Sequence, residues 1–290
     1  MLKESINTIL ITVNFDLANK GLRPPFLSKP CKIRSIFRNS TQLTKNMKYS
    51  GNYTIRTNEI TKDKTLSVPS MLMLMQEASM QNVIELKASV WDMEKDDMSW
   101  VLLRKKLNIF RYPVLGDVVT VVTYPSHFEK VFAFRDYKMY DVNGELLAQA
   151  SSTWTLLNTK TRKLEKIPQI FLDMKTPNDE EILTPPESKI IRPEKCEFSK
   201  KFKIGWFDID WNEHVNSVFL IKSIIESTPK EILKTRKIIE LIYHIRSESF
   251  FGETVRVEGE SVKNSYHAYR MHNVDREKEV VFCIIMWRLL

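Results

Sequence analysis

The sequence predicts an α+β protein made of two similar halves, each containing one helix followed by a run of antiparallel strands. Apolar residues alternate with polar ones in several segments after each of two helix-like segments. The order of these segments also repeats. Gly116-Asp117-Val118 corresponds to Gly252-Glu253-Thr254, and Trp154 near the end of the first half corresponds to Trp287 near the end of the second.

The first half begins with Tyr53–Arg56, which is typical of a short strand. Ser67 is the expected N-cap of a helix that carries Pro69 in its first turn and extends to about Lys87. Asn143-Gly144 predicts a hairpin turn between the last two of the following strands. These strands are expected at 100–109, 118–122, 131–140 and 146–157.

The second half repeats this order. A short strand at 202–204 precedes a helix over Val215–Ser227, which Pro229 ends. Strands are then expected at 239–248, 255–262, 265–274 and 280–289. The helix is apolar nearly all round, as a helix wrapped by a sheet should be. We therefore predict two tandem hotdog domains, each an antiparallel sheet wrapped around one long helix.

Composition fits a globular protein. The chain has 290 residues, of which 43% are apolar and 28% charged, and this excludes a disordered or collagen-like chain. No apolar run approaches the roughly 18 residues that a membrane helix needs. The three cysteines, Cys31, Cys196 and Cys283, are too few and too widely spaced for a disulfide framework or a cysteine zinc site. They indicate a reducing compartment, and we expect a cytoplasmic protein.

The net charge of +8 is concentrated at the start of the chain. Residues 1–46 carry eight basic and two acidic residues, so the remainder is nearly neutral and a nucleic-acid-binding function is a poor interpretation. We interpret residues 1–46 as an extension that is disordered or not made, with Met47 as the start. Import into a plastid by this segment is the alternative.

The domain boundaries follow from these patterns. A first domain is expected over 47–167 and a second over 195–290, with residues 168–194 between them. This intervening segment contains several prolines and acidic residues, which predicts a linker.

Polar residues cluster just before the second helix, where the first half has only ordinary helix-start residues. Asp210, Asn212 and His214 alternate, so an extended approach would place all three on one face. Asp210 or Asn212 is equally suited to be the helix N-cap, and His214 to be an ordinary surface or core histidine. If the cluster is catalytic, it suits acyl hydrolysis. Helix amides and Asn212 would hold an oxyanion, and a neutral His214 in the first helical turn would accept a proton.

Further segments resemble the acyl-acyl-carrier-protein thioesterases of plants and their bacterial relatives, over about residues 50–290. In the second half, the resemblance depends most on residues 208–216 and on Arg246-Ser247-Glu248. In the first half, the matching segments are 53–56, 76–78, 111–113, 116–119, 150–154 and 162–168. This resemblance implies tandem hotdog domains, hydrolysis of fatty acyl thioesters and an acyl carrier protein as partner. We expect no cofactor, because the sequence has no phosphate-binding glycine loop and no metal-ligand cluster among its five histidines.

The resemblance also implies a site. Asp210, Asn212, His214 and Glu248 match the active-site positions of the family, with Glu248 at the end of an expected strand. Ser249 stands where plant members carry a cysteine once proposed as nucleophile, so we favour direct attack by water, with Ser249 as a possible accessory residue.

In this family the first domain shapes the acyl pocket. Met71, Met75, Trp91 and Trp100 are our candidates for its lining, although core packing explains any one methionine equally well. Candidate docking charges for the acidic carrier protein are grouped at 160–166, 200–203 and 104–106.

Three other functions stay open at this point. Coenzyme A thioesterases use the same fold and the same phosphopantetheine arm, and hydroxyacyl dehydratases also pair a histidine with a carboxylate. A non-catalytic acyl-binding module is the third alternative. Both a monomer and a homodimer are compatible with tandem hotdog domains.

Overall fold

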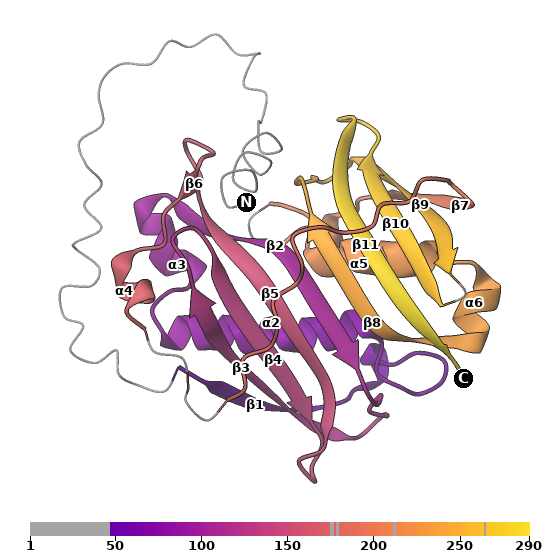
Figure 1. Ribbon diagram of the computed structural model, residues 1–290, viewed down its shortest axis with the longest axis horizontal. Helices are drawn as coiled ribbons and strands as arrows, with labels where there is room; N and C mark the ends of the chain where they lie inside the picture. Colours follow the sequence, from indigo (N-terminus) through magenta and orange to yellow (C-terminus); the bar gives the residue numbers. More distant parts are fainter. Residues whose placement is uncertain (1–46, 175–176, 178–179, 211–212, 264) are drawn as a thin grey trace.

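The computed structural model describes residues 47–290 except 175–176, 178–179, 211–212 and 264 (Figure 1). The expectation for residues 1–46 therefore lies outside the described residues. Within the described part, the strands form one continuous antiparallel sheet in the order β1-β3-β4-β5-β2-β8-β11-β10-β9-β7, with β6 added beside β5. The strands are β1 (Tyr49–Thr54), β2 (Met98–Ile109), β3 (Val118–Phe128), β4 (Ala133–Tyr140), β5 (Leu146–Asn158), β6 (Leu164–Glu165), β7 (Phe198–Lys203), β8 (Arg236–Ile245), β9 (Thr254–Lys263), β10 (Tyr266–Asn273) and β11 (Lys278–Leu289).

The two expected long helices lie on the same face of this sheet (Figure 1). The α-helices are α2 (Val68–Glu85), α3 (Val90–Met93), α4 (Gln169–Leu172), α5 (Ser217–Ser227) and α6 (Lys230–Thr235), and short 3₁₀ helices span Thr57–Glu59, Glu94–Asp96 and Trp206–Asp208. As predicted, the Ser67 hydroxyl caps α2, accepting a hydrogen bond of 3.1 Å from the amide of Ser70. Pro69 lies in its first turn, where a missing N–H costs nothing.

The two halves share a large hydrophobic core, and a smaller cluster of buried residues belongs to the first half. Helices α2 and α5 contact each other, and one cluster of buried residues includes Met71 and Leu107 from the first half with Ile221 and Leu241 from the second. The sheets join where β2 pairs antiparallel with β8, so that Leu107 lies directly opposite Leu241. The predicted α+β architecture of two hotdog-like halves is confirmed.

Two predicted boundaries are wrong in a way that matters for the site. Helix α5 begins at Ser217 rather than Val215, because its N-cap is Asn216, whose side chain accepts a 2.9 Å hydrogen bond from the amide of Val218. Neither Asp210 nor His214 is therefore part of the helix or its cap. Strand β8 ends at Ile245, three residues before Glu248.

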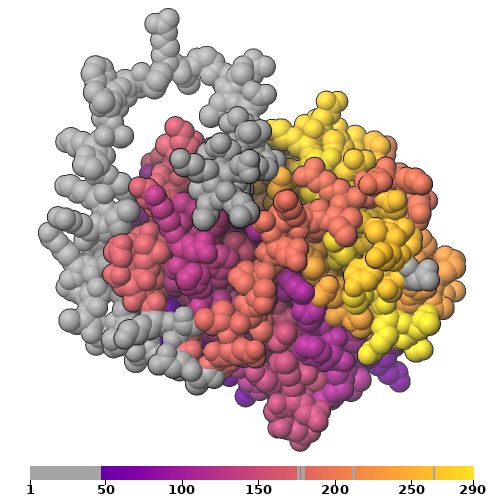
Figure 2. All heavy atoms as spheres, in the orientation of Figure 1, coloured from indigo at the N-terminus to yellow at the C-terminus, as the bar shows by residue number. Residues whose placement is uncertain are grey.

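The later part of the expected linker, residues 180–194, crosses the sheet on the face away from α2 and α5 (Figures 1 and 2). The amide of Leu183 donates to Asp136 at 2.8 Å, and Glu180 forms an ion pair of 2.8 Å with Lys138. Further along, the hydroxyl of Ser151 donates to the carbonyl of Thr184 at 3.0 Å. The segment is thus fastened to strands β4 and β5 by hydrogen bonds and charge.

In the described part of the chain, no helix is long and apolar enough to cross a membrane.

The Asp136 contact predicts a pH dependence of stability. Burial raises the pKa of this carboxyl from 3.8 to about 6, although hydrogen bonds from Leu183 and Ser126 oppose the shift. The native state therefore binds a proton that the unfolded chain has lost between about pH 4 and pH 6, and stability contributed at low pH is lost as the pH rises through this window. We expect Asp136→Asn to remove this loss, gaining about 1–3 kcal/mol over the wild type between pH 4 and pH 7.

Urea unfolding at a series of pH values measures the effect. Asp173→Asn, at an exposed position, is the matched control and should follow the wild type. Parallel stability profiles for the wild type and Asp136→Asn would contradict the role of Asp136.

Candidate active site

The segment that carries Asp210 and His214 turns back on itself instead of running extended. Ile209 and Val215 form an antiparallel bridge, and the amide of Asp210 donates to the carbonyl of His214 at 2.8 Å. Glu213 adopts a left-handed backbone with φ of 63° to complete the turn. The expected arrangement of alternating residues along an extended approach is therefore wrong. Asn212 lies outside the described residues.

A second segment, from Arg246 to Ser249, packs beside this turn. The amide of Val215 donates to the carbonyl of Ser249 at 3.0 Å, which joins the two segments. The amide of Arg246 donates to Val280 at 2.8 Å, and the hydroxyl of Ser247 donates to the carbonyl of Glu279 on β11. Backbone hydrogen bonds on both sides thus fix Glu248 relative to His214.

Glu248 lies between a cation from the first half and a histidine from the second. One carboxylate oxygen accepts a hydrogen bond from the guanidinium of Arg162, which belongs to the turn between β5 and β6. The other oxygen lies 3.6 Å from Nδ1 of His214. The ring of Phe250 packs edge-on against His214, with centroids 5.3 Å apart. These contacts fix the carboxylate of Glu248 and the imidazole of His214 relative to each other, as acid–base catalysis requires.

Ser249 is buried, and its side-chain oxygen accepts a 3.0 Å hydrogen bond from Nδ2 of Asn273. Asn273 also donates to Glu253, which accepts a further hydrogen bond from the amide of Phe250 and lies 3.9 Å from Nε of Arg276. Among the described residues, no histidine or carboxylate forms a hydrogen bond with the Ser249 hydroxyl. This environment suits a structural role better than that of an activated nucleophile.

The site opens into a cavity of about 470 Å³ that reaches into the first half. Asp210, His214, Glu248 and Ser249 line one part of it. Val83, Leu86, Trp100, Phe128 and Phe171 form an apolar wall elsewhere. A cavity of this size and character can enclose an apolar chain next to a few polar groups.

The candidates for the acyl pocket differ in where they lie. Trp100 lines the cavity, and its indole N–H donates to the carbonyl of Ala88. Met71 and Met75 are fully buried in the shared core and do not line the cavity, whereas Met80 on the same helix does. Trp91 is 55% exposed and is not part of the lining either. The helical spacing of α2 explains the difference, because the cavity borders a different face from that of Met71 and Met75.

Helix α5 offers fewer amides to an oxyanion than the sequence suggests. The amide of Val218 is capped by the Asn216 side chain, and the amide of Phe219 donates to the carbonyl of Asn216. We expected His214 in the first turn of the helix. This prediction is wrong, because His214 precedes α5.

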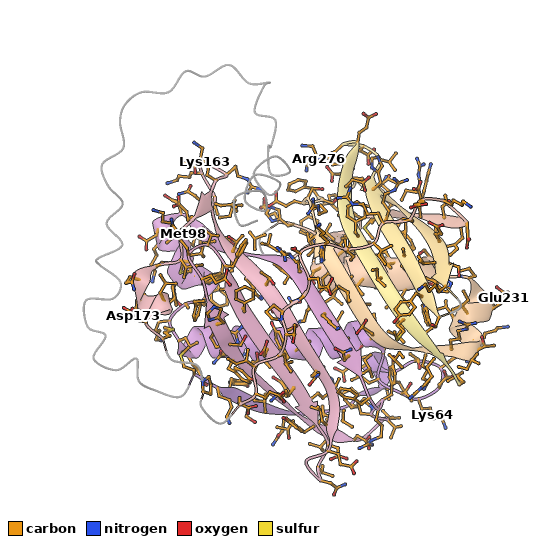
Figure 3. All side chains as sticks on the ribbon, in the orientation of Figure 1. Lys64, Met98, Lys163, Asp173, Glu231 and Arg276 are labelled. Atoms are coloured by element: carbon orange, nitrogen blue, oxygen red, sulfur yellow. The ribbon has the colours of Figure 1, made fainter. Side chains whose placement is uncertain are left out.

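Sequence reasoning missed Arg162 as part of the site and placed it among the docking charges at 160–166. The contact with Glu248 joins residues 86 positions apart, and nothing local distinguishes this arginine from the lysines around it. Figure 3 shows the neighbouring Lys163 and the β10–β11 turn residue Arg276 at the same end of the molecule. Only the pairing of the two half-sheets brings this turn to the site.

Within the described ranges, no group of three or more His, Cys, Asp or Glu side chains is arranged to hold a metal ion.

Comparison with known proteins gives the family. Residues 46–174 match the family model described as the acyl-ACP thioesterase N-terminal domain, and residues 191–289 match that of the C-terminal domain. This chain belongs to the acyl-ACP thioesterase family.

The sequence identity to three individual relatives ranges from 23% to 33%. A palmitoyl-acyl carrier protein thioesterase of Cuphea hookeriana is 31% identical over 86% of this chain and 62% of its own length. An acyl-[acyl-carrier-protein] hydrolase of Cuphea viscosissima is 33% identical over 68% of this chain and 51% of its own. The chain thus spans about half to three-fifths of the length of these relatives. The solved 12:0-ACP thioesterase of Umbellularia californica matches with a TM-score of 0.73 at 23% identity, over 84% of this chain and 98% of that one.

The Arg162–Glu248 contact yields a prediction. We expect Arg162→Met to lower the rate of thioester hydrolysis by roughly tenfold, because Glu248 loses the charged hydrogen bond that fixes it. A small pantetheine thioester without a carrier protein should be the substrate, so that the assay is blind to docking. Lys163→Met, which removes an exposed charge from the same turn, is the control and should leave the rate unchanged. Equal rates for wild type and Arg162→Met would contradict a role for Arg162 in the site.

Proposed function

We propose that this protein hydrolyses acyl-acyl-carrier-protein thioesters and releases the free fatty acid, which ends chain elongation. The observation that carries the proposal is the position of Glu248. It holds His214 of the second half and Arg162 of the first half at the opening of a largely apolar cavity. Membership of the acyl-ACP thioesterase family supports the same substrate class.

The proposed reaction is direct attack by water. The oxygen of water bonds to the thioester carbonyl carbon while its proton passes to a base, and the carbon–sulfur bond then breaks to leave a carboxylic acid and a thiol. If Nδ1 of His214 carries a proton toward Glu248, Nε2 presents the lone pair that accepts the proton of water. Glu248 and His214 thus share the work of the general base, and Arg162 fixes the carboxylate.

The oxyanion of the tetrahedral intermediate needs a hydrogen-bond donor. We assign this role to the Asn212 side chain, as the resemblance to the family implies, because the amides of Val218 and Phe219 at the start of α5 are already engaged. Asp210 lines the cavity beside His214, and we propose that it orients its neighbours. Ser249 is held by Asn273, which supports a mechanism without a covalent intermediate.

The relatives named above are described as acting on acyl carrier protein or its palmitoyl ester, and we propose the same partner here. The structure removes two residues from the candidate docking charges for the carrier protein. Lys105 is only 4% exposed, which removes the centre of the 104–106 group, and Arg162 is engaged by Glu248. The exposed lysines at 160, 163 and 166 and at 200, 201 and 203 stay as candidates.

Hydrolysis of coenzyme A esters is the second candidate. Both substrates present the same thioester and pantetheine arm, so a site on this chain that recognised only the arm would not separate them. Initial rates on carrier-protein and coenzyme A esters of the same acyl group distinguish the two functions. A salt-sensitive preference for the carrier protein supports the proposal, because docking on lysines weakens with ionic strength.

The cytoplasmic location of this protein stays a prediction. The two Cuphea relatives named above are described as chloroplastic.

We expect His214→Ala to lower thiol release from acyl-carrier-protein substrates by at least about a hundredfold, the usual contribution of a positioned general base. His127→Ala is the matched control, because His127 is an exposed histidine on β3 and lies outside the cavity lining. Ser249→Ala should keep most of the activity. Full activity in His214→Ala would overturn the proposed mechanism, and complete loss in a folded Ser249→Ala variant would favour a covalent one.

A further inference from the structure

The cavity contains a row of polar side chains that thioester hydrolysis does not use. Arg135 on β4 pairs with Ser152 on β5, Ser152 pairs with Lys105 on β2, and Lys105 pairs with Tyr243 on β8. Directly opposed residues on adjacent strands project to the same side of a sheet. Arg135, Lys105 and Tyr243 accordingly all line the cavity, together with Tyr137.

This polar row lies between an apolar row and the closed core. On the side toward the site, Ala133, Trp154, Leu102 and Ile245 line the cavity. On the other side, the next row consists of Tyr137, Ala150, Leu107 and Leu241, all at most 1% exposed. Seen from the site, the polar row therefore forms part of the cavity wall beyond the apolar row, where an unsubstituted acyl chain would need an apolar surface.

Lys105 is the least expected member. It is 4% exposed, and its ammonium group lies 4.0 Å above the ring of Tyr137. Among the described residues, Nζ of Lys105 makes no hydrogen bond and no contact with a carboxylate. Burial lowers the pKa of Lys105, and nearby Arg135 lowers it further, while Tyr137 opposes the shift.

The residues around Lys105 do not neutralise its positive charge. Arg135, also buried, donates to the side-chain oxygens of Asn82 at 2.7 Å and Thr123 at 3.2 Å, and both acceptors are neutral. Although burial alone would raise it, the pKa of Tyr137 is lowered, because of the cations of Lys105 and Arg135 and hydrogen bonds with Ser79 and Ser152. Asp136 alternates to the opposite face, where it accepts from Leu183. The side chains of Lys105 and Arg135 thus both line the cavity, and no carboxylate of the described residues lies between them.

A packed core gains nothing from two desolvated cations, whereas a ligand with a negative or strongly polar oxygen would complete the site. We propose that this row, with Lys105 as the central donor, binds an oxygen function at the far end of the acyl chain. A carboxylate fits it best, because it alone neutralises the charge. The preferred substrate would then be an acyl thioester whose distal end is oxidised, rather than a plain alkyl chain.

The spacing agrees with a distal position. Tyr243, at the end of the row, precedes Glu248 by five residues, which corresponds to at most roughly 16 Å along a strand. This reach leaves room for an acyl chain of several carbon atoms between the thioester and the polar row. This inference rests on the proposed function, since it names the acyl group that the same cavity takes.

Binding of free acids tests the inference separately from hydrolysis. Titration calorimetry should compare three acids of one chain length: the unsubstituted fatty acid, its ω-hydroxy derivative and the dicarboxylic acid. The wild type should bind the dicarboxylic acid roughly tenfold or more tightly than the unsubstituted acid. Lys105→Met should abolish or reverse this preference, and Lys105→Gln should keep part of the preference for the hydroxy acid.

Lys106→Met is the matched control, because Lys106 alternates to the other face and pairs with Glu240 at 2.9 Å. It should keep the wild-type order of affinities. The melting temperature of Lys105→Met should equal or exceed that of the wild type, since a desolvated charge is removed, and this guards against misfolding as the explanation.

Equal affinities for the three acids, tighter binding of the unsubstituted acid, binding of none of them, or an unchanged preference in Lys105→Met would each overturn the inference. Hydrolysis of an unsubstituted acyl thioester by the same wild-type preparation keeps the two proposals apart. Turnover without a preference for the oxidised chain would refute the inference and leave the proposed function standing. Absence of turnover on any thioester, with selective binding intact, would refute the proposed function alone.

Discussion

The pairing of β2 with β8 is the constraint on which the rest of the structure depends. Each half-sheet would otherwise expose a long edge, and an unpaired edge invites association with other chains. The join is reinforced by side chains, since Asn108 donates to Glu240 at 2.9 Å and the hydroxyl of Tyr112 donates to the carbonyl of Ile238 at 2.7 Å. One continuous sheet results, and both long helices pack on the same side of it.

This join also explains why the site is shared. Once β2 lies beside β8, the turn after β5 comes within reach of the segment after β8, and Arg162 can contact Glu248. The first half then supplies the cavity wall and a cation, while the second supplies the carboxylate and the imidazole. The duplicated halves have therefore diverged in role while they keep one architecture.

The sequence predicts this architecture well because its determinants are local. Alternating apolar residues, the Ser67 cap and the Asn143-Gly144 turn each act over a few residues, and the corresponding strands and helix form where expected. The site is less predictable. Asn216 competes as a helix cap with Asp210 and Asn212, and only the Ile209–Val215 bridge decides between them.

Long-range contacts set the limit of such predictions. Arg162 looks like any residue of a solvated basic run until the sheet places it on Glu248, and Lys105 looks like one of three adjacent cations until strand pairing buries it. Met71 and Met75 illustrate the converse. Their composition suits a lipid pocket, but packing decides that they fill the core.

The central claim is that one site is built from both halves, and a double-mutant cycle on Arg162 and Glu248 tests it most directly. Hydrolysis of a small thioester should be measured for Arg162→Met, Glu248→Gln and the double variant. If Arg162 acts through Glu248, the double variant should be no slower than Glu248→Gln alone, with a coupling energy of about 1 kcal/mol or more. Losses that simply add, with a coupling near zero, would contradict a shared site.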